Sequence, residues 1–168
     1  MAISYASSSA LGSNSMRIRM TIRGEKALRG LSLLFLRKII RETLSQAFPK
    51  VFTAHRNVIL DVACISDEAI AKLNGEYRQK LKPTDILSFG SFEGLDALKE
   101  APAGPIDLGQ VVLSPDFIAR SAKEDGVSWK REFTYVFSHG ILHLVGFDHE
   151  EEMFQIQDVV TDRLASRD

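Results

Sequence analysis

Three of the four histidines, His139, His143 and His149, fall within eleven residues of this chain. His139 and His143 are four residues apart, so on a helix their imidazoles share one face and can reach the same metal ion. Gly146 can adopt the left-handed conformation that ends a helix, and the turn would bring His149 to that ion from another direction. Three neutral imidazoles with a fourth position left for water are typical of catalytic zinc. We therefore predict one Zn²⁺ per chain, with Asp148 as a candidate acceptor for the spare ring N–H of a ligand.

Two other interpretations of these histidines compete with catalytic zinc. A histidine pair at helical spacing also occurs on solvated faces and in satisfied cores, but a third histidine beyond a helix-ending glycine favours a metal. A structural zinc usually recruits cysteine thiolates. The only cysteine, Cys64, belongs to a different predicted element, which favours the catalytic interpretation.

The spacing His-x-x-x-His-x-x-Gly-x-x-His is that of metzincin proteases, with one difference. Those enzymes carry a glutamate directly after the first histidine, where it serves as general base. Gly140 occupies that position here. A peptidase mechanism would therefore lack the group that takes a proton from the attacking water.

A cluster of cations precedes one of the predicted strands. Lys72, Arg78, Lys80 and Lys82 lie within eleven residues at a junction between a helix and a strand. Such a cluster can bind a phosphate, and an arginine can present two parallel N–H donors to it. The alternative is an ordinary solvated surface.

Composition limits the function classes. The chain has 168 residues, 45% hydrophobic and 26% charged, as expected of a soluble globular protein with one domain. Because the net charge is −1, contact with nucleic acid must come from a local basic patch. A single cysteine fits a reducing compartment, and no apolar run approaches a membrane span. Residues 1–15 are rich in serine and predict a disordered extension, followed by one domain over 16–168.

Periodicity predicts the elements that position these residues. Four strands are expected, at residues 17–23, 58–65, 85–89 and 108–113. Helices are expected after the first strand, after N-caps at Ser66, Ser114 and Ser128, and after His149. Residues 91–107, with two glycines and two prolines, predict a long loop beside the site. This order predicts an α+β fold with a four-stranded mixed sheet and about five helices.

Two further expectations concern side chains on these helices. Tyr77 is expected to be buried with Ile70 and Leu73 on the helix that Ser66 opens. On the first helix the cations are expected to form a solvated face; they are Arg37, Lys38 and Arg41.

Taken together, the two motif-bearing stretches resemble the YbeY family, bacterial endoribonucleases of rRNA maturation. His139–His149 matches HGxLHLxG[YF]DH, and Leu73–Phe89 is similar to LNxxYRxxxKPTDVLSF; the segment 108–114 resembles a third block. The resemblance covers roughly residues 55–160. Three positions depart from it: Gln110 and Leu81 replace common aspartates, and Gly90 replaces a common proline.

The resemblance implies a zincin-like α+β fold, zinc held by the three histidines, and cleavage of single-stranded RNA. It also implies that Arg78 serves the active site. The leading hypothesis is a zinc-dependent endoribonuclease of the cytoplasm that matures the 3′ end of 16S rRNA, acts in ribosome quality control and has the small ribosomal subunit as partner. Arg78 and His139 are the expected catalytic residues, and Arg78, Lys80 and Lys82 the expected RNA contacts.

Two alternatives remain beside this hypothesis. One is a zinc peptidase or amidase on the same scaffold, against which Gly140 argues. The other is a ribosome assembly factor in which the zinc is structural. Asp148 and a zinc hydroxide are both candidates for the general base.

Overall fold

The structure, a computed structural model, describes residues 16–52 and 56–166. Within these ranges the elements are β1 (Arg17–Arg23), a 3-10 helix (Glu25–Leu28), α1 (Leu33–Ala47), β2 (Asn57–Cys64), α2 (Asp67–Arg78), β3 (Ile86–Gly90), α3 (Leu95–Lys99), β4 (Ile106–Leu113), α4 (Pro115–Glu124), α5 (Trp129–Leu144) and α6 (Glu151–Leu164). The segment 1–15, for which disorder is predicted, lies outside the described residues.

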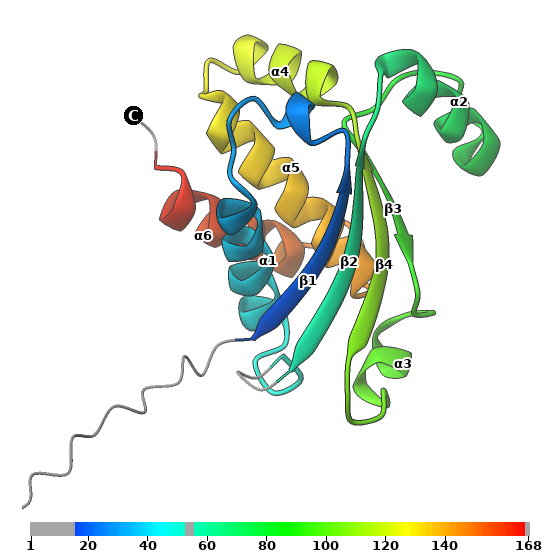
Figure 1. Cartoon of the computed structure of the whole chain (residues 1–168), viewed down its shortest axis with the longest axis vertical. Coiled ribbons are helices and arrows are strands. Elements are labelled where there is room, and N and C mark those ends of the chain that lie inside the picture. The colour runs from blue at the N-terminus through cyan, green and yellow to red at the C-terminus, as the bar shows by residue number, and fades with distance from the viewer. Residues whose placement is uncertain (1–15, 53–55, 167–168) are drawn as a thin grey trace, which may run out of the picture.

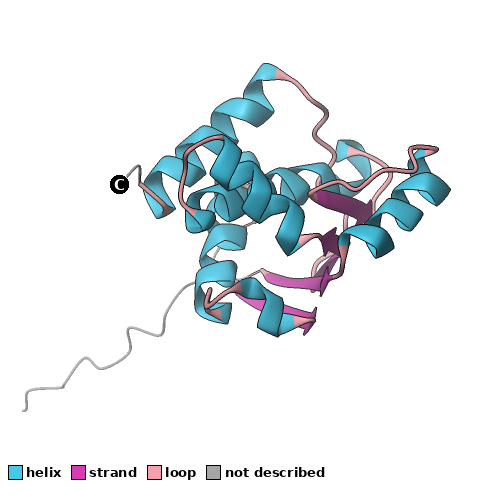
Figure 2. Ribbon diagram, turned by 90° about the horizontal axis from the view of Figure 1, so that it is seen from above, coloured by secondary structure: helices cyan, strands magenta, loops and turns pink. Residues whose placement is uncertain are grey.

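The sheet has four strands in the order β1-β2-β4-β3. β1, β2 and β4 are parallel, and β3 runs antiparallel to β4 at one edge. The predicted α+β class and the mixed sheet are therefore confirmed. On one side of the sheet α1, α5 and α6 pack against one another, and α5 also contacts β3 and β4 (Figures 1 and 2).

The two faces of the sheet are covered unequally. Alternate side chains of a strand point to opposite faces, and those of β2 on one face, Val58, Leu60 and Val62, join the large core beneath α1, α5 and α6. On the other face a small cluster contains Ala63 and, from α2, Ile70. α2 therefore stands on this second face, apart from the main helical layer (Figure 1).

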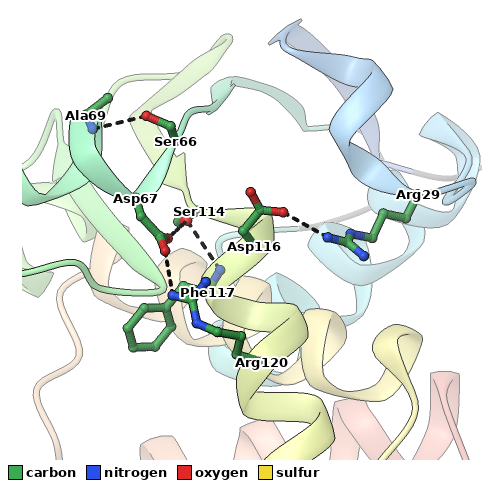
Figure 3. A network of polar contacts seen from close by, with 8 residues as sticks. All are labelled: Arg29, Ser66, Asp67, Ala69, Ser114, Asp116, Phe117 and Arg120. Carbon is green, nitrogen blue, oxygen red and sulfur yellow. Dashed lines mark hydrogen bonds and ion pairs between the residues drawn. The ribbon is translucent and has the colours of Figure 1, made fainter.

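A polar network holds the start of α2 against α4 (Figure 3). Ser114 accepts a hydrogen bond from the amide of Phe117 as the N-cap of α4, and its hydroxyl donates to Asp67 at 2.6 Å. Arg120 donates to the other carboxylate oxygen of Asp67 at 2.5 Å. The bond from Ser114 and the charge of Arg120 lower the pKa of Asp67 despite its partial burial. Arg78 is the last residue of the same helix.

Two expectations about local structure are wrong. The predicted loop at 91–107 contains the helix α3, whose Leu98 is fully buried, and its end already belongs to β4. A five-residue helix is too short to show an apolar period, so only its buried leucine marks it. Tyr77 is 65% exposed, because α2 has only the small cluster beneath it; its ring meets the edge of Phe89, with centroids 4.9 Å apart.

The cations of α1 are only partly solvated. Lys38 is exposed, but Arg37 and Arg41 are half-buried. Arg41 donates a hydrogen bond to the carbonyl of Met16 at 3.2 Å, so it joins α1 to the start of β1. Among the helices described here, none combines the length and apolar composition that a bilayer crossing requires.

Candidate metal centre

The first two predicted ligands project from the last turns of α5. His139 and His143 are one helical turn apart, and their Nε2 atoms approach to 2.9 Å. The helix itself is held in place by its apolar side, from which Phe133 and Phe137 are fully buried. A buried hydrogen bond of 3.0 Å between the hydroxyls of Ser138 and Thr43 also joins α5 to α1.

The third histidine arrives through the turn that ends α5. Gly146 has φ 93°, the left-handed conformation predicted for it, and the amide of Phe147 donates to the carbonyl of Leu142 across the turn. His149 then lies with its ring centroid 5.0 Å from that of His139 and 4.7 Å from that of His143. One ligand atom from each histidine lies within 4.8 Å of the others.

Hydrogen bonds on the far side of two rings fix their orientation. Nδ1 of His139 lies 3.1 Å from Oε1 of Gln157, and Nδ1 of His143 lies 2.8 Å from the carbonyl oxygen of Phe147. Both acceptors favour the tautomer that carries its proton on Nδ1 and leaves Nε2 free for a metal. Asp148 is exposed and accepts neither bond. Asp148 is therefore not the acceptor for His139 or His143, and its predicted role stays a prediction for His149 alone.

Gln157 is the site residue that the sequence analysis missed. It is fully buried on α6, and its amide nitrogen donates to the carbonyl of Tyr135 at 3.3 Å. A signal was present in the sequence, since Gln157 interrupts the apolar stripe formed by Met153, Ile156 and Val160. A buried polar side chain needs a partner, and here that partner is a histidine ring.

The electrostatics of the pair suit metal binding. Burial is the main cause that lowers the pKa of His139 and of His143 below the ordinary value. The charge of Arg78 lowers both pKa values further, whereas the hydrogen bond to Gln157 raises that of His139 and the bond to the Phe147 carbonyl raises that of His143. Metal ligation requires neutral imidazole, and these shifts favour it.

The geometry also fits a tetrahedral ion. Zn–N bonds of about 2.0–2.1 Å place tetrahedral ligand nitrogens about 3.4 Å apart. That spacing falls between the 2.9 Å that separates the Nε2 atoms of His139 and His143 and the 4.8 Å that bounds all three ligand atoms. The three nitrogen donors therefore fit Zn²⁺ without a change of fold.

Gly140 lies where α5 packs closely against β3. A Cβ built on Gly140 would overlap Cδ1 of Ile86 and come within 3.2 Å of its Cγ1 and of the Ser88 hydroxyl. That hydroxyl donates to the Gly140 carbonyl at 3.0 Å. At the position that carries the glutamate of metzincins, any side chain would thus have to displace Ile86 at a close contact between α5 and β3.

Comparison with known proteins now identifies the family. The profile of the Endoribonuclease YbeY family matches residues 25–165. The chain belongs to this family. A protein of Mycoplasmopsis synoviae named Endoribonuclease YbeY is 41% identical over 120 residues, which cover 71% of this chain and 75% of that protein. One of Synechococcus sp. (strain RCC307) with the same name is 48% identical over 86 residues, 51% of this chain and 52% of that protein.

A solved structure agrees with the family assignment. The solution structure of TM1509 from Thermotoga maritima has a TM-score of 0.51 and 26% sequence identity to this chain. The match covers 89% of this chain and 88% of that one, so the similarity extends over nearly the whole fold.

Three positions depart from the YbeY pattern, and all lie outside the histidine site. Gln110 is half-buried in β4 opposite Phe89, and Leu81 is 80% exposed. Gly90 ends β3, and a Cβ there would make ordinary contact with the carbonyl oxygen of Leu144. The hydrogen bonds that orient the two helical histidines therefore do not depend on these departures.

The predicted RNA contacts of this YbeY family member lie on the surface. Arg78, Lys80 and Lys82 are all exposed, and within the described residues none of them forms an ion pair. The charge of Arg78 acts on the pKa of both His139 and His143, so its guanidinium lies within electrostatic range of the metal centre. Of the three cations, Arg78 is the one whose charge affects the pKa of His139 and of His143.

Proposed function

We propose that this chain is a zinc-dependent endoribonuclease that cleaves single-stranded RNA in rRNA processing. The observation that carries the proposal is the convergence of His139, His143 and His149 within electrostatic range of Arg78, which forms no ion pair with the other described residues. The name of the family supports RNA as the substrate. We further propose action at the 3′ end of 16S rRNA, a role in ribosome quality control, the small ribosomal subunit as partner, and cytoplasmic location, with residues 16–168 acting as one domain.

The histidines and their partners prepare the metal position. His139, His143 and His149 would hold Zn²⁺, and Gln157 and the Phe147 carbonyl keep the two helical rings in the tautomer that binds metal. Bound zinc would supply Lewis-acid polarisation of a phosphate oxygen and lower the pKa of a water molecule. Every other contribution must come from side chains around the site.

In this proposal Arg78 is the side chain that acts on the phosphate. A guanidinium stays protonated and can donate two parallel hydrogen bonds, so it can bind the scissile phosphate and offset the charge that develops on it. Lys80 and Lys82 are exposed beyond it and would contact the neighbouring RNA backbone. Asp148 is exposed next to His149 and is the candidate acceptor for the proton of the attacking group.

Neither alternative has comparable support. A peptidase would need a base at Gly140, where Ile86 and Ser88 leave no space. A purely structural zinc would give no role to Arg78, an exposed cation without an ion pair in the described part of the chain whose charge acts on the histidines. The assembly-factor alternative predicts that loss of a ligand unfolds the protein.

The test combines metal content, folding and cleavage in one set of proteins. Wild type, His143→Ala and, as a control, Gln155→Ala would be assayed on a single-stranded RNA, the same RNA in duplex and casein. We expect about one zinc per chain and cleavage of single-stranded RNA alone for wild type and Gln155→Ala. His143→Ala should stay folded but lose zinc and activity. Cleavage of casein, or equal zinc in His143→Ala, would contradict the proposal, and unfolding of His143→Ala would favour the assembly factor.

A further inference from the structure

An exposed aromatic ring stands beside the metal centre. Phe154, near the start of α6, is 39% exposed, and its ring centroid lies 6.3 Å from that of His149 at an interplanar angle of 38°. Among the described residues, Phe154 is the one strongly exposed phenylalanine. Leaving an apolar ring in water has a cost that burial would remove.

The position of Phe154 on α6 relates it to the buried side of the same site. Phe154 and Gln157 are three residues apart, so they share one face of the helix. Gln157 contacts His139 in the interior, and Phe154 contacts His149 at the surface. One face of α6 therefore forms a wall of the metal centre from its buried base to its rim.

Packing of the core does not account for the presence of Phe154 at this position. α6 is anchored by Met153, Ile156, Val160 and Leu164, all of which are buried. Val159 is the other exposed large apolar residue of α6, at 43%, and unlike Phe154 it has no ring contact with a histidine. Phe154 is thus an exposed apolar surface placed at the rim of a polar site.

We propose that Phe154 is the stacking surface for a nucleobase of the RNA substrate, next to the phosphate that is cleaved. The inference rests on the proposed endoribonuclease function. Unpaired bases stack on aromatic side chains whatever their identity, because every base has a π-face. A phosphate bound at the metal centre would have the base of its own nucleotide close to the ring of Phe154, since that ring contacts the ligand His149.

This subsite also accounts for selectivity for single strands. A base in a duplex is already stacked between its neighbours and would have to be unstacked to reach the ring. Phe154 therefore favours unpaired RNA without reading its sequence. Arg78, in contrast, acts on the phosphate, so the two residues contribute to different parts of the nucleotide.

The test separates aromatic stacking from apolar packing. Zinc-loaded wild type, Phe154→Ala, Phe154→Leu and Phe154→Trp, with Val159→Ala as the matched control on α6, would be compared on a single-stranded oligoadenylate. We expect Phe154→Ala to raise KM by about 5- to 150-fold with kcat nearly unchanged. Phe154→Trp should retain the wild-type KM, Phe154→Leu should not, and Val159→Ala should behave as wild type. Zinc content and thermal unfolding should be the same in all five proteins.

A second substrate series locates the stacked base. Each oligonucleotide in this series carries a single abasic site, at a different position in each. At one position the missing base should weaken binding to wild type but should not further weaken binding to Phe154→Ala. The effects of the abasic site and of the substitution are then non-additive, as expected when both remove the same contact. A Phe154→Leu protein equal to wild type, an unchanged KM in Phe154→Ala, or additive losses at every position would each overturn the stacking subsite. If wild type does not cleave RNA, the proposed endoribonuclease function is wrong. If wild type cleaves RNA but the Phe154 variants behave in one of these ways, only the stacking subsite is wrong.

Discussion

Oε1 of Gln157 lies 3.1 Å from Nδ1 of His139, and this contact joins the last helix of the chain to the metal centre on α5. Because Gln157 is fully buried and also donates to the Tyr135 carbonyl, its amide cannot turn without losing one of two hydrogen bonds. The orientation of His139 is therefore set by a residue that would not itself touch a bound metal.

Replacing Gln157 by leucine should weaken zinc binding more than it weakens the fold. Leucine keeps the volume but leaves Nδ1–H of His139 without an acceptor, and loss of such an outer partner typically costs about 10- to 100-fold in metal affinity. Competition with a chromophoric chelator measures the affinity. Gln155→Leu is the matched control, since Gln155 is exposed on the same helix and its side chain donates to Glu151 at the surface. Equal affinity in the two variants would remove Gln157 from the site.

A methyl group at Gly140 should destabilise the protein by overpacking. The added Cβ of Gly140→Ala would overlap Cδ1 of Ile86, and overpacking of this kind costs about 1–3 kcal/mol. Ile86→Val removes that Cδ1 atom, so the double variant should recover part of the loss. Urea unfolding of the two single variants and the double variant gives the coupling, and strictly additive free energies would refute the contact.

The same contact predicts the behaviour of Gly140→Glu. This change restores the metzincin pattern in the sequence, but the carboxylate has no space at the contact between α5 and β3. We expect an unstable protein without peptidase activity. Cleavage of a peptide library by a folded Gly140→Glu protein would show that the peptidase alternative was dismissed wrongly.

The convergence of the three histidines could be predicted from sequence because its geometry is local. The spacing of His139 and His143 places both rings on one helical face in any context, and Gly146 marks the end of that helix by its own conformational freedom. The helix N-caps at Ser66, Ser114 and Ser128 are local for the same reason, and each accepts the expected amide hydrogen bond.

What could not be predicted depends on contacts between distant segments. Gln157 meets His139 only because α6 packs on α5, and Gly140 matters only because β3 lies under it. Tyr77 is apolar in pattern but exposed, because α2 covers little of the sheet. The period of the apolar residues predicts which side chains of an element are buried, but it does not predict which other element packs against them.

Acidification should destabilise the zinc-free protein through the histidine pair. Burial lowers the pKa of His139 and His143 in the folded state, so below about pH 6.5 the unfolded chain binds more protons than the folded one. The free energy of unfolding therefore falls as pH drops from about 6.5 towards the lower folded pKa values. Urea unfolding in EDTA measures this slope, which should be shallower in His139→Gln/His143→Gln. Asp67, whose pKa is also lowered, is the same in wild type and in the double variant, so its contribution cancels in the comparison.

The thiol of Cys64 should react slowly in the folded protein. Burial raises its pKa from the ordinary 9.0 to about 11. The smaller thiolate fraction, offset in part by the greater nucleophilicity of a more basic thiolate, predicts alkylation roughly 10- to 15-fold slower near neutral pH. Iodoacetamide labelling followed by mass spectrometry, with urea-unfolded protein as the reference, measures the ratio, and a ratio near one would contradict the burial of Cys64.

Arg78 should be needed for turnover and not for zinc binding or folding. It ends α2, forms no ion pair among the described residues, and acts electrostatically on His139 and His143. If its guanidinium stabilises the transition state, Arg78→Ala should lower kcat by about 100- to 1,000-fold, by analogy with the loss of one oxyanion donor. Arg78→Lys should lose much of this activity too, because an ammonium cannot offer two parallel donors to a phosphate. Zinc content and thermal unfolding should stay at the wild-type values.

The competing explanation is that Arg78 only adds to a basic surface around Lys80 and Lys82. In that case the loss would appear in KM, would be imitated by added salt, and would be overcome at saturating RNA. Kinetics of Arg78→Ala at two salt concentrations distinguish the outcomes, with Lys72→Ala as control, since Lys72 is an exposed cation on the same helix. A kcat equal to wild type at saturating RNA would exclude Arg78 from catalysis. A lowered kcat that does not change with salt would assign it to the transition state, because screening weakens a surface cation far more than a guanidinium bound directly to the reacting phosphate.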